Sequence, residues 1–132
     1  MKQNRLMYLK YSVLGIASIF LLSACSGGGS SSSRVQIPSL MSPSAVTGDA
    51  ARKNNEGVDH LVQGHYDVAL KYFKEALAMK PNFAEAHFNM AISLDGMGKH
   101  TEATAAFKKA KEFGGENQKI VDSTILKKHL NL

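Results

Sequence analysis

The sequence contains only one cysteine, Cys25, and this scarcity excludes several kinds of chemistry. A single thiol cannot form a disulfide within the chain, and it cannot supply the two cysteines of a CxxC or CxxCH motif. The HExxH pair of zinc proteases and a glycine-rich phosphate-binding loop are also missing. The sequence therefore indicates neither an enzyme nor a bound cofactor.

A long apolar run is missing as well. The most apolar stretch, residues 12–22, has eleven residues and follows a basic stretch over residues 1–11. A membrane-spanning helix needs about 20 apolar residues, whereas a short apolar run behind a positively charged end is typical of a secretion signal. We therefore expect residues 1–24 to be a cleaved signal peptide.

Neither sign of charge dominates once this predicted signal is set aside. From Cys25 onward, the chain has 13 Lys and Arg residues against 11 Asp and Glu residues. Proteins that bind nucleic acid usually show a concentrated basic stripe, and none is evident here. We therefore expect no nucleic-acid partner.

Five histidines raise the question of a metal site. They stand at positions 60, 65, 87, 100 and 129. His60 and His65 are five residues apart and so do not share a helix face. His60 and His87 are better interpreted as substitutes for packed aromatic side chains, so the sequence predicts no metal site.

The residues behind the apolar run resemble a known processing signal. Leu22-Ser23-Ala24-Cys25 is similar to the bacterial lipobox, in which the cysteine becomes lipid-modified. The resemblance implies a lipid anchor on Cys25. Because Ser26 rather than Asp follows, it also implies the outer membrane, facing the periplasm, or the outer face of the cytoplasmic membrane if the organism has a single membrane. The alternative is an ordinary signal peptide cut at Ser23 or Ala24, which leaves a free thiol.

Residues 25–47 have the composition of a tether. Residues 26–33 read SGGGSSSS and offer no apolar side chain to bury, so they favour flexible chain. Pro38 and Pro43 make extended chain more favourable than helix in the second half. The apolar residues of segment 35–41 leave two interpretations open, because they are either ordinary linker composition or a segment that packs against the domain.

The rest of the chain contains an internal repeat. A shift of 34 residues aligns residues 50–83 with residues 84–117. The identical pairs are Ala50/Ala84, Asn55/Asn89, Gly64/Gly98, Ala69/Ala103, Phe73/Phe107, Lys74/Lys108 and Ala76/Ala110. Apolar residues recur at spacings of three and four within 66–77, 86–94 and 103–110, which predicts amphipathic helices. Gly64 and Gly98 stand between these stripes, where a glycine lets a helix end in the left-handed conformation.

This repeat resembles the tetratricopeptide repeat, a helix-turn-helix unit of 34 residues. The residues that carry the resemblance are Gly57, Gly64, Tyr66, Ala69, Phe73, Ala76 and Pro81 in the first unit, and Ala91, Leu94, Gly98, Ala103, Phe107 and Ala110 in the second. It implies an all-α fold, a short α-solenoid with two units in residues 48–117 and a capping helix over 118–132. Two units are fewer than the usual three, so a partner or self-association would supplement their stability.

The resemblance also implies a groove formed by the first helix of each unit. The groove positions are Asn54, Val58, Leu61 and Val62 from the first unit, Phe88, Asn89, Ile92 and Asp95 from the second, and Lys119 and Asp122 from the capping helix. Some family members hold a peptide carboxylate with Lys, Arg and Asn residues, of which only Asn89 and Lys119 have counterparts here, so we expect no such clamp.

Val58, Phe88 and Ile92 suggest an apolar strip that accepts an extended segment or an amphipathic helix. On that interpretation, Phe88 and Ile92 can be truncated without unfolding the domain. The alternative is that these side chains are covered internally, for example by segment 35–41, which would make the protein self-inhibited.

These expectations together predict a lipid-anchored, noncatalytic adaptor. It would bind an unidentified periplasmic or cell-envelope protein and hold it near the membrane, where envelope machinery is assembled. The alternative is an obligate structural subunit of a multiprotein membrane complex, which folds only with its neighbours.

Overall fold

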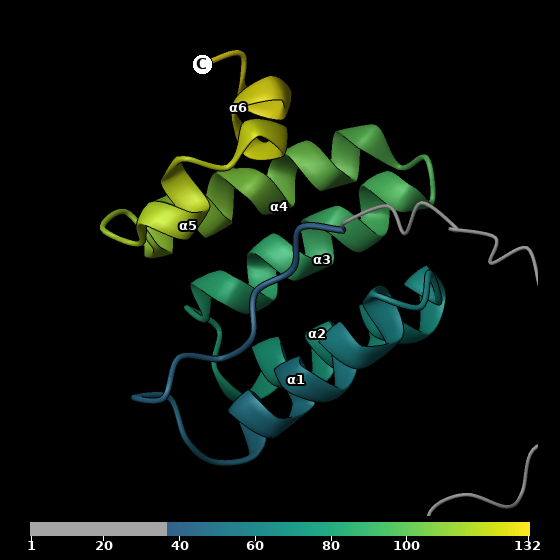
Figure 1. The fold of residues 1–132 in the computed structure, drawn as a ribbon, viewed down its shortest axis with the longest axis vertical. Coiled ribbons are helices and arrows are strands. Elements are labelled where there is room, and N and C mark those ends of the chain that lie inside the picture. The colour runs from purple at the N-terminus through teal and green to yellow at the C-terminus, as the bar shows by residue number, and fades with distance from the viewer. Residues whose placement is uncertain (1–36) are drawn as a thin grey trace, which may run out of the picture. The chain divides into compact units, whose positions relative to one another are not determined.

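Helices account for all the regular secondary structure in residues 37–132, the part of the chain that the computed structural model describes (Figure 1). The predicted signal peptide, Cys25 and residues 26–36 lie outside the described residues. Within the described part, no helix has the length and apolar character needed to cross a membrane. The helices are α1 (Asp49–Leu61), α2 (Tyr66–Met79), α3 (Ala84–Gly96), α4 (His100–Phe113), α5 (Gln118–Val121) and α6 (Thr124–Leu130).

The four long helices form two hairpins. Helix α1 packs on α2, α3 packs on α4, and α2 and α3 join the two hairpins. Figure 1 shows the short helices α5 and α6 beyond α4, at the C-terminal end of the row. The prediction of an all-α fold built from two helix-turn-helix units is confirmed.

The same turn closes both hairpins. Gly64 and Gly98 have φ angles of 78° and 75°, which are left-handed conformations that favour glycine. The N–H of each glycine donates to the carbonyl three residues earlier, and the next N–H donates to the carbonyl five residues before it. This is the Schellman motif, so the two glycines end α1 and α3 as the sequence predicted.

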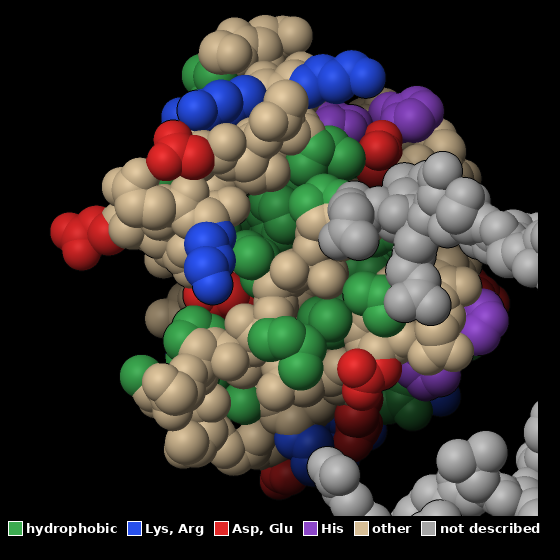
Figure 2. All heavy atoms as spheres, in the orientation of Figure 1, with side chains coloured by type: hydrophobic (Ala, Val, Ile, Leu, Met, Phe, Trp, Pro, Cys, Tyr) green, Lys and Arg blue, Asp and Glu red, His purple; other side chains and the backbone are tan. Residues whose placement is uncertain are grey.

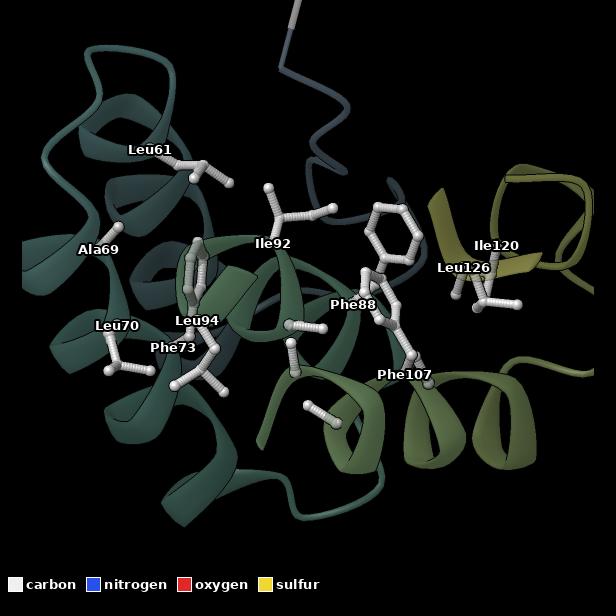
Figure 3. Packing of buried hydrophobic residues seen from close by; sticks show 14 of the residues in the cluster. Leu61, Ala69, Leu70, Phe73, Phe88, Ile92, Leu94, Phe107, Ile120 and Leu126 are labelled. Carbon is white, nitrogen blue, oxygen red and sulfur yellow. The ribbon is translucent and has the colours of Figure 1, made fainter. Parts of the chain in front are cut away.

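One apolar core runs through both hairpins (Figure 3). Phe73 and Phe107, which are equivalent in the repeat, are both fully buried. Phe73 packs so closely on α1 that a Cβ atom on Gly57 would lie 2.5 Å from its ring. Phe107 meets Phe88 edge to face, with ring centroids 5.5 Å apart. The repeat therefore places one large aromatic side chain inside each hairpin, as predicted.

The C-terminal segment differs from the single capping helix expected over residues 118–132. It consists of α5 and α6, and the chain breaks between them at Ser123, whose hydroxyl accepts a hydrogen bond from the Leu126 N–H. A side-chain acceptor at this position favours a new helix start over continuation of the old helix. Ile120 and Leu126 are nonetheless fully buried, so both short helices close the core beside α4.

Two histidines pack as aromatic side chains would. The His60 ring stacks on Tyr72 with ring centroids 5.3 Å apart. His87 is buried against Phe113, and its Nε2 lies 2.8 Å from the Pro81 carbonyl oxygen. The Nδ1 atom of His87 is buried without a hydrogen-bond partner, so a second proton on this ring would have no acceptor. Burial lowers the pKa of His87, and the charge of Lys109 acts in the same direction.

We expect His87 to make the domain acid-sensitive. Its pKa in the folded state lies below the unfolded value of about 6.5, so the unfolded chain binds the proton first as the pH falls. The stability that neutral His87 contributes is therefore fully present above that pH and is lost as the pH falls toward the folded-state pKa. The free energy of unfolding then changes by at most about 1.4 kcal/mol per pH unit. Urea unfolding at pH 7.5 and pH 5.5 should show a smaller loss of stability in His87→Phe than in the unchanged chain. Equal losses would contradict the assignment.

Candidate functional site

Residues 37–42 lie across the two first helices of the repeat units, α1 and α3. The segment has no regular secondary structure, and Ile37 and Leu40 pack against the apolar core. Figure 1 shows this part of the chain crossing α3 before it turns back toward the start of α1. Of the two interpretations of segment 35–41, the structure therefore supports packing against the domain for its described residues.

Two fully buried asparagines hold the main chain of Leu40. The Leu40 N–H donates to Oδ1 of Asn89 at 2.7 Å, and Nδ2 of Asn89 donates back to the Leu40 carbonyl at 2.7 Å. Nδ2 of Asn54 donates to the same carbonyl at 3.1 Å. The two side chains are also joined, since Nδ2 of Asn89 lies 2.9 Å from Oδ1 of Asn54. Both polar groups of one peptide residue are thus bound by side-chain amides.

A second main-chain contact lies two residues further along. The Ser42 N–H donates to Oδ1 of Asn55 at 2.8 Å, and the Ser42 hydroxyl donates to the Ala51 carbonyl at 3.1 Å. Because successive side chains of an extended chain point to opposite sides, residues 40 and 42 present their main-chain groups to the same surface. The three asparagines therefore bind extended backbone, and their hydrogen bonds do not depend on the side chain of the bound residue, as with an added β-strand.

The predicted groove positions fall into three groups. Asn54 and Asn89 make the main-chain contacts just described. Val58, Leu61, Phe88 and Ile92 belong to the core, and the structure therefore favours internal cover over an open apolar strip. Val62 is exposed at the end of α1, and Asp95 lies away from segment 37–42, with histidines of α4 and α6.

Lys119 and Asp122 lie beside the bound segment. They line an open pocket between residues 38–40 and the α5–α6 region, with Phe88 among its lining residues. Lys128 of α6 lines the same pocket, so both signs of charge are present. Figure 2 shows hydrophobic side chains in the middle of this face and charged side chains at its borders. An extended segment longer than residues 37–42 would therefore contact apolar side chains in this pocket and charged side chains of both signs at its edge.

Asn55 and Ser42 were not among the site residues predicted from the sequence. Asn55 was one of the seven identities in the 34-residue alignment, where it matches Asn89. Identity of a polar residue in two repeats was the available signal, because a helix surface rarely requires the same amide twice. Ser42 carried no comparable signal, since its contact depends on how the preceding segment folds back.

Comparison with known proteins agrees with this architecture. The family model for tetratricopeptide repeats matches residues 60–119. Residues 60–119 are therefore similar to tetratricopeptide repeats. The chain is 32% identical over 79 residues, or 56% of its length, to the human protein named Tetratricopeptide repeat protein 6. The aligned part covers only 15% of that human protein. No solved structure matches the chain significantly.

The similarity to tetratricopeptide repeats can be compared with the position of this site. In stacked tetratricopeptide hairpins, the first helices line the concave surface. Here those helices are α1 and α3, and they carry Asn54, Asn55 and Asn89. The bound segment thus lies on the helices that correspond to the concave surface of such hairpins.

Proposed function

We propose that this chain is a membrane-anchored, noncatalytic adaptor that holds an extended segment of a cell-envelope protein on the α1–α3 surface. The observation that carries the proposal is the asparagine pair Asn54 and Asn89, which binds both main-chain polar groups of Leu40. A buried polar pair of this kind is costly unless its hydrogen bonds are made. The surface is therefore built to be occupied by peptide backbone.

The occupant in this structure is part of the chain itself. Residues 37–42 are joined covalently to the domain, so they bind without the entropy cost of bringing two molecules together. A partner segment must displace them. Its apparent affinity is therefore the intrinsic affinity multiplied by the fraction of molecules in which the surface is open. The segment thus makes binding selective for partners that add contacts beyond the backbone, for example in the pocket beside Lys119 and Phe88.

The membrane part of the proposal rests on the lipobox resemblance at Cys25. Residues 26–36 separate that cysteine from the bound segment, and twelve peptide steps span at most about 40 Å. A lipid on Cys25 would therefore keep the α1–α3 surface within that distance of the membrane. Partners attached to or emerging from the same membrane would meet it at high effective concentration.

The core favours an adaptor over an obligate subunit. Phe73, Phe107, Ile120 and Leu126 are fully buried by the chain's own residues. An obligate subunit would be expected to leave a large apolar face for its neighbours. Two hairpins closed by α5 and α6 supply a core that does not depend on a partner.

Photo-crosslinking in the native cells tests the proposal. A photoreactive residue at position 119 is expected to capture a partner, because Lys119 is exposed and lines the pocket beside the bound segment. Excess synthetic peptide with the sequence of residues 35–44 should reduce the captured band, because it competes for the same asparagines. Cys25→Ser should move the chain from the membrane fraction to the soluble fraction.

The matched control carries the photoreactive residue at position 71. Lys71 is exposed on α2 and does not line the pocket. Equal capture at positions 71 and 119, or capture that the peptide leaves unchanged, would count against the α1–α3 surface as the binding site. A Cys25→Ser chain that stays in the membrane fraction would count against the anchor alone.

A further inference from the structure

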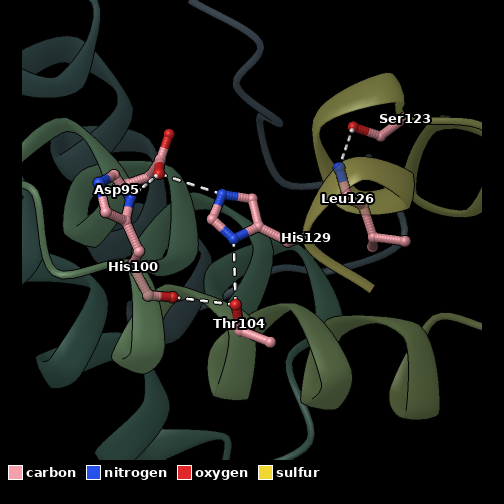
Figure 4. A network of polar contacts seen from close by, with 6 residues as sticks. All are labelled: Asp95, His100, Thr104, Ser123, Leu126 and His129. Atoms are coloured by element: carbon pink, nitrogen blue, oxygen red, sulfur yellow. Dashed lines mark hydrogen bonds and ion pairs between the residues drawn. The ribbon is translucent and has the colours of Figure 1, made fainter. Parts of the chain in front are cut away.

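Three metal-ligating side chains from three different elements meet at the end of the second hairpin (Figure 4). Asp95 lies near the end of α3, His100 begins α4, and His129 lies in α6. Oδ1 of Asp95 is 2.7 Å from Nδ1 of His100 and 3.0 Å from Nε2 of His129. All three ligand atoms lie within 4.8 Å of one another. Two imidazole nitrogens are thus aimed at one carboxylate oxygen.

The surroundings hold this group in place and leave one side open. The side chain of His129 is only 11% exposed, and its ring packs on Phe107 with centroids 4.9 Å apart. The side chain of His100 is 70% exposed. One ligand is therefore fixed by the core, while the opposite side allows an ion and a water molecule to enter.

Thr104 contacts the ring nitrogen of His129 that faces away from Asp95. Its hydroxyl donates to the His100 carbonyl at 2.9 Å, so it accepts from Nδ1 of His129 at 3.1 Å. Nε2 of His129, the other ring nitrogen, then faces the Asp95 carboxylate at 3.0 Å. In metalloproteins, a hydrogen bond of this kind on the second nitrogen orients a ligating histidine.

We propose that Asp95, His100 and His129 form a binding site for a divalent transition metal, with zinc as the ion that best fits two imidazoles and one carboxylate. Tetrahedral zinc, with bonds of 2.0–2.2 Å, keeps its ligand atoms about 3.4 Å apart. The present separations of 2.7 and 3.0 Å are about 0.7 and 0.4 Å shorter, so binding would require the two imidazoles to move away from the carboxylate oxygen by that amount. Water would supply the fourth ligand, as it does at open zinc sites.

The site has a structural consequence within the domain. It joins α6 to the α3–α4 turn, and α6 otherwise packs mainly on α4. Helix α6 has seven residues, which is too short to be stable alone. A bound ion therefore fixes the C-terminal helix on the second hairpin.

The test is titration of the full-length chain, without a histidine tag and after treatment with chelator, using ZnCl₂ and then CoCl₂. We expect saturable one-to-one zinc binding by calorimetry and a higher melting temperature. Bound Co²⁺ should show the visible absorption of a tetrahedral site. His100→Gln should weaken zinc binding at least tenfold without affecting folding, because that side chain is largely exposed. Thr104→Val should weaken it about 10- to 100-fold, because the hydroxyl orients His129.

His65→Gln is the matched control, since His65 is an exposed histidine outside the proposed site. It should bind zinc as the unchanged chain does. If no saturable binding is seen at zinc concentrations up to about 100 μM, the proposal is overturned, because a site with a weaker dissociation constant would add little to the stability of the domain. Zinc binding that His100→Gln and Asp95→Asn leave unchanged would also overturn it. Loss of binding in His65→Gln would place the metal near His60 and His65 and overturn the proposal as well.

Discussion

Replacing Phe88 and Ile92 together by alanine is expected to unfold the domain at room temperature. Phe88 is 1% exposed and packs edge to face on Phe107, and Ile92 is 4% exposed in the same core. Truncating a buried Phe costs about 3–5 kcal/mol and truncating a buried Ile about 2–5 kcal/mol. A domain of this size has a total stability of about 5–15 kcal/mol, so the pair removes most of it. Circular dichroism at 222 nm should show loss of helix, and urea titration of each single variant should show the separate costs.

Val62→Ala is the matched control for this pair. Val62 was assigned to the same groove from the sequence, but it is 50% exposed. Its truncation should change the free energy of unfolding by less than about 0.5 kcal/mol, as is usual for surface positions. A Phe88→Ala, Ile92→Ala chain that keeps its helical signal and its unfolding midpoint would show that both side chains line an open surface after all.

The repeat itself could be predicted from the sequence because it is written in local patterns. Apolar residues at spacings of three and four define a helix face, and Gly64 and Gly98 mark the turns. The 34-residue shift then relates one hairpin to the next. The apolar spacing and the two glycines each lie within a few residues of the structure that they specify, and the four long helices follow from them.

The site could be predicted only in part, because its contacts are not local. Asn54 and Asn89 look like surface residues until the main chain of Leu40 is placed over them, and that residue is 14 and 49 positions away along the chain. The position of residues 37–42 also decides which apolar side chains of α1 and α3 are covered. Periodicity identifies a face of a helix, but it does not say what packs on it.

The C-terminal region shows a related limit. The apolar residues of 118–132 indicate burial, and Ile120 and Leu126 are indeed buried. Two helices deliver them, because the chain breaks at Ser123, whose hydroxyl accepts from the Leu126 N–H. The meeting of His129 with Asp95 and His100 depends in turn on where that break directs α6.

Asn89→Ala is expected to release residues 37–42 from the domain. The change removes the acceptor of the Leu40 N–H and one donor to its carbonyl, and it leaves Oδ1 of Asn54 without its 2.9 Å partner. Loss of one partner from a buried hydrogen-bonded group costs about 1–3 kcal/mol. Amide hydrogen exchange at Leu40 should therefore become about 5- to 150-fold faster, since 1.4 kcal/mol corresponds to a factor of ten. Exchange measured by NMR checks this residue by residue.

Asn82→Ala is the control for this substitution, because Asn82 is an exposed asparagine in the α2–α3 turn. It should leave exchange at Leu40 unchanged. In Asn89→Ala, the amide of Phe107 in α4 should accelerate less than that of Leu40 if the asparagine holds the segment. Equal acceleration at both amides would mean that Asn89 supports the helices and not the bound segment.

A second variant, Leu40→Asp, separates occupancy of the surface from its binding capacity. It should also speed amide hydrogen exchange in residues 37–42, because a charged side chain replaces one that packs on the core. It leaves Asn54, Asn55 and Asn89 in place. If a partner uses the same main-chain contacts, Leu40→Asp should increase crosslinking at position 119, whereas Asn89→Ala should decrease it. Both substitutions open the surface, and only one removes the amide that a partner needs, so their effects on capture must have opposite signs. Effects of the same sign would mean that the partner binds elsewhere.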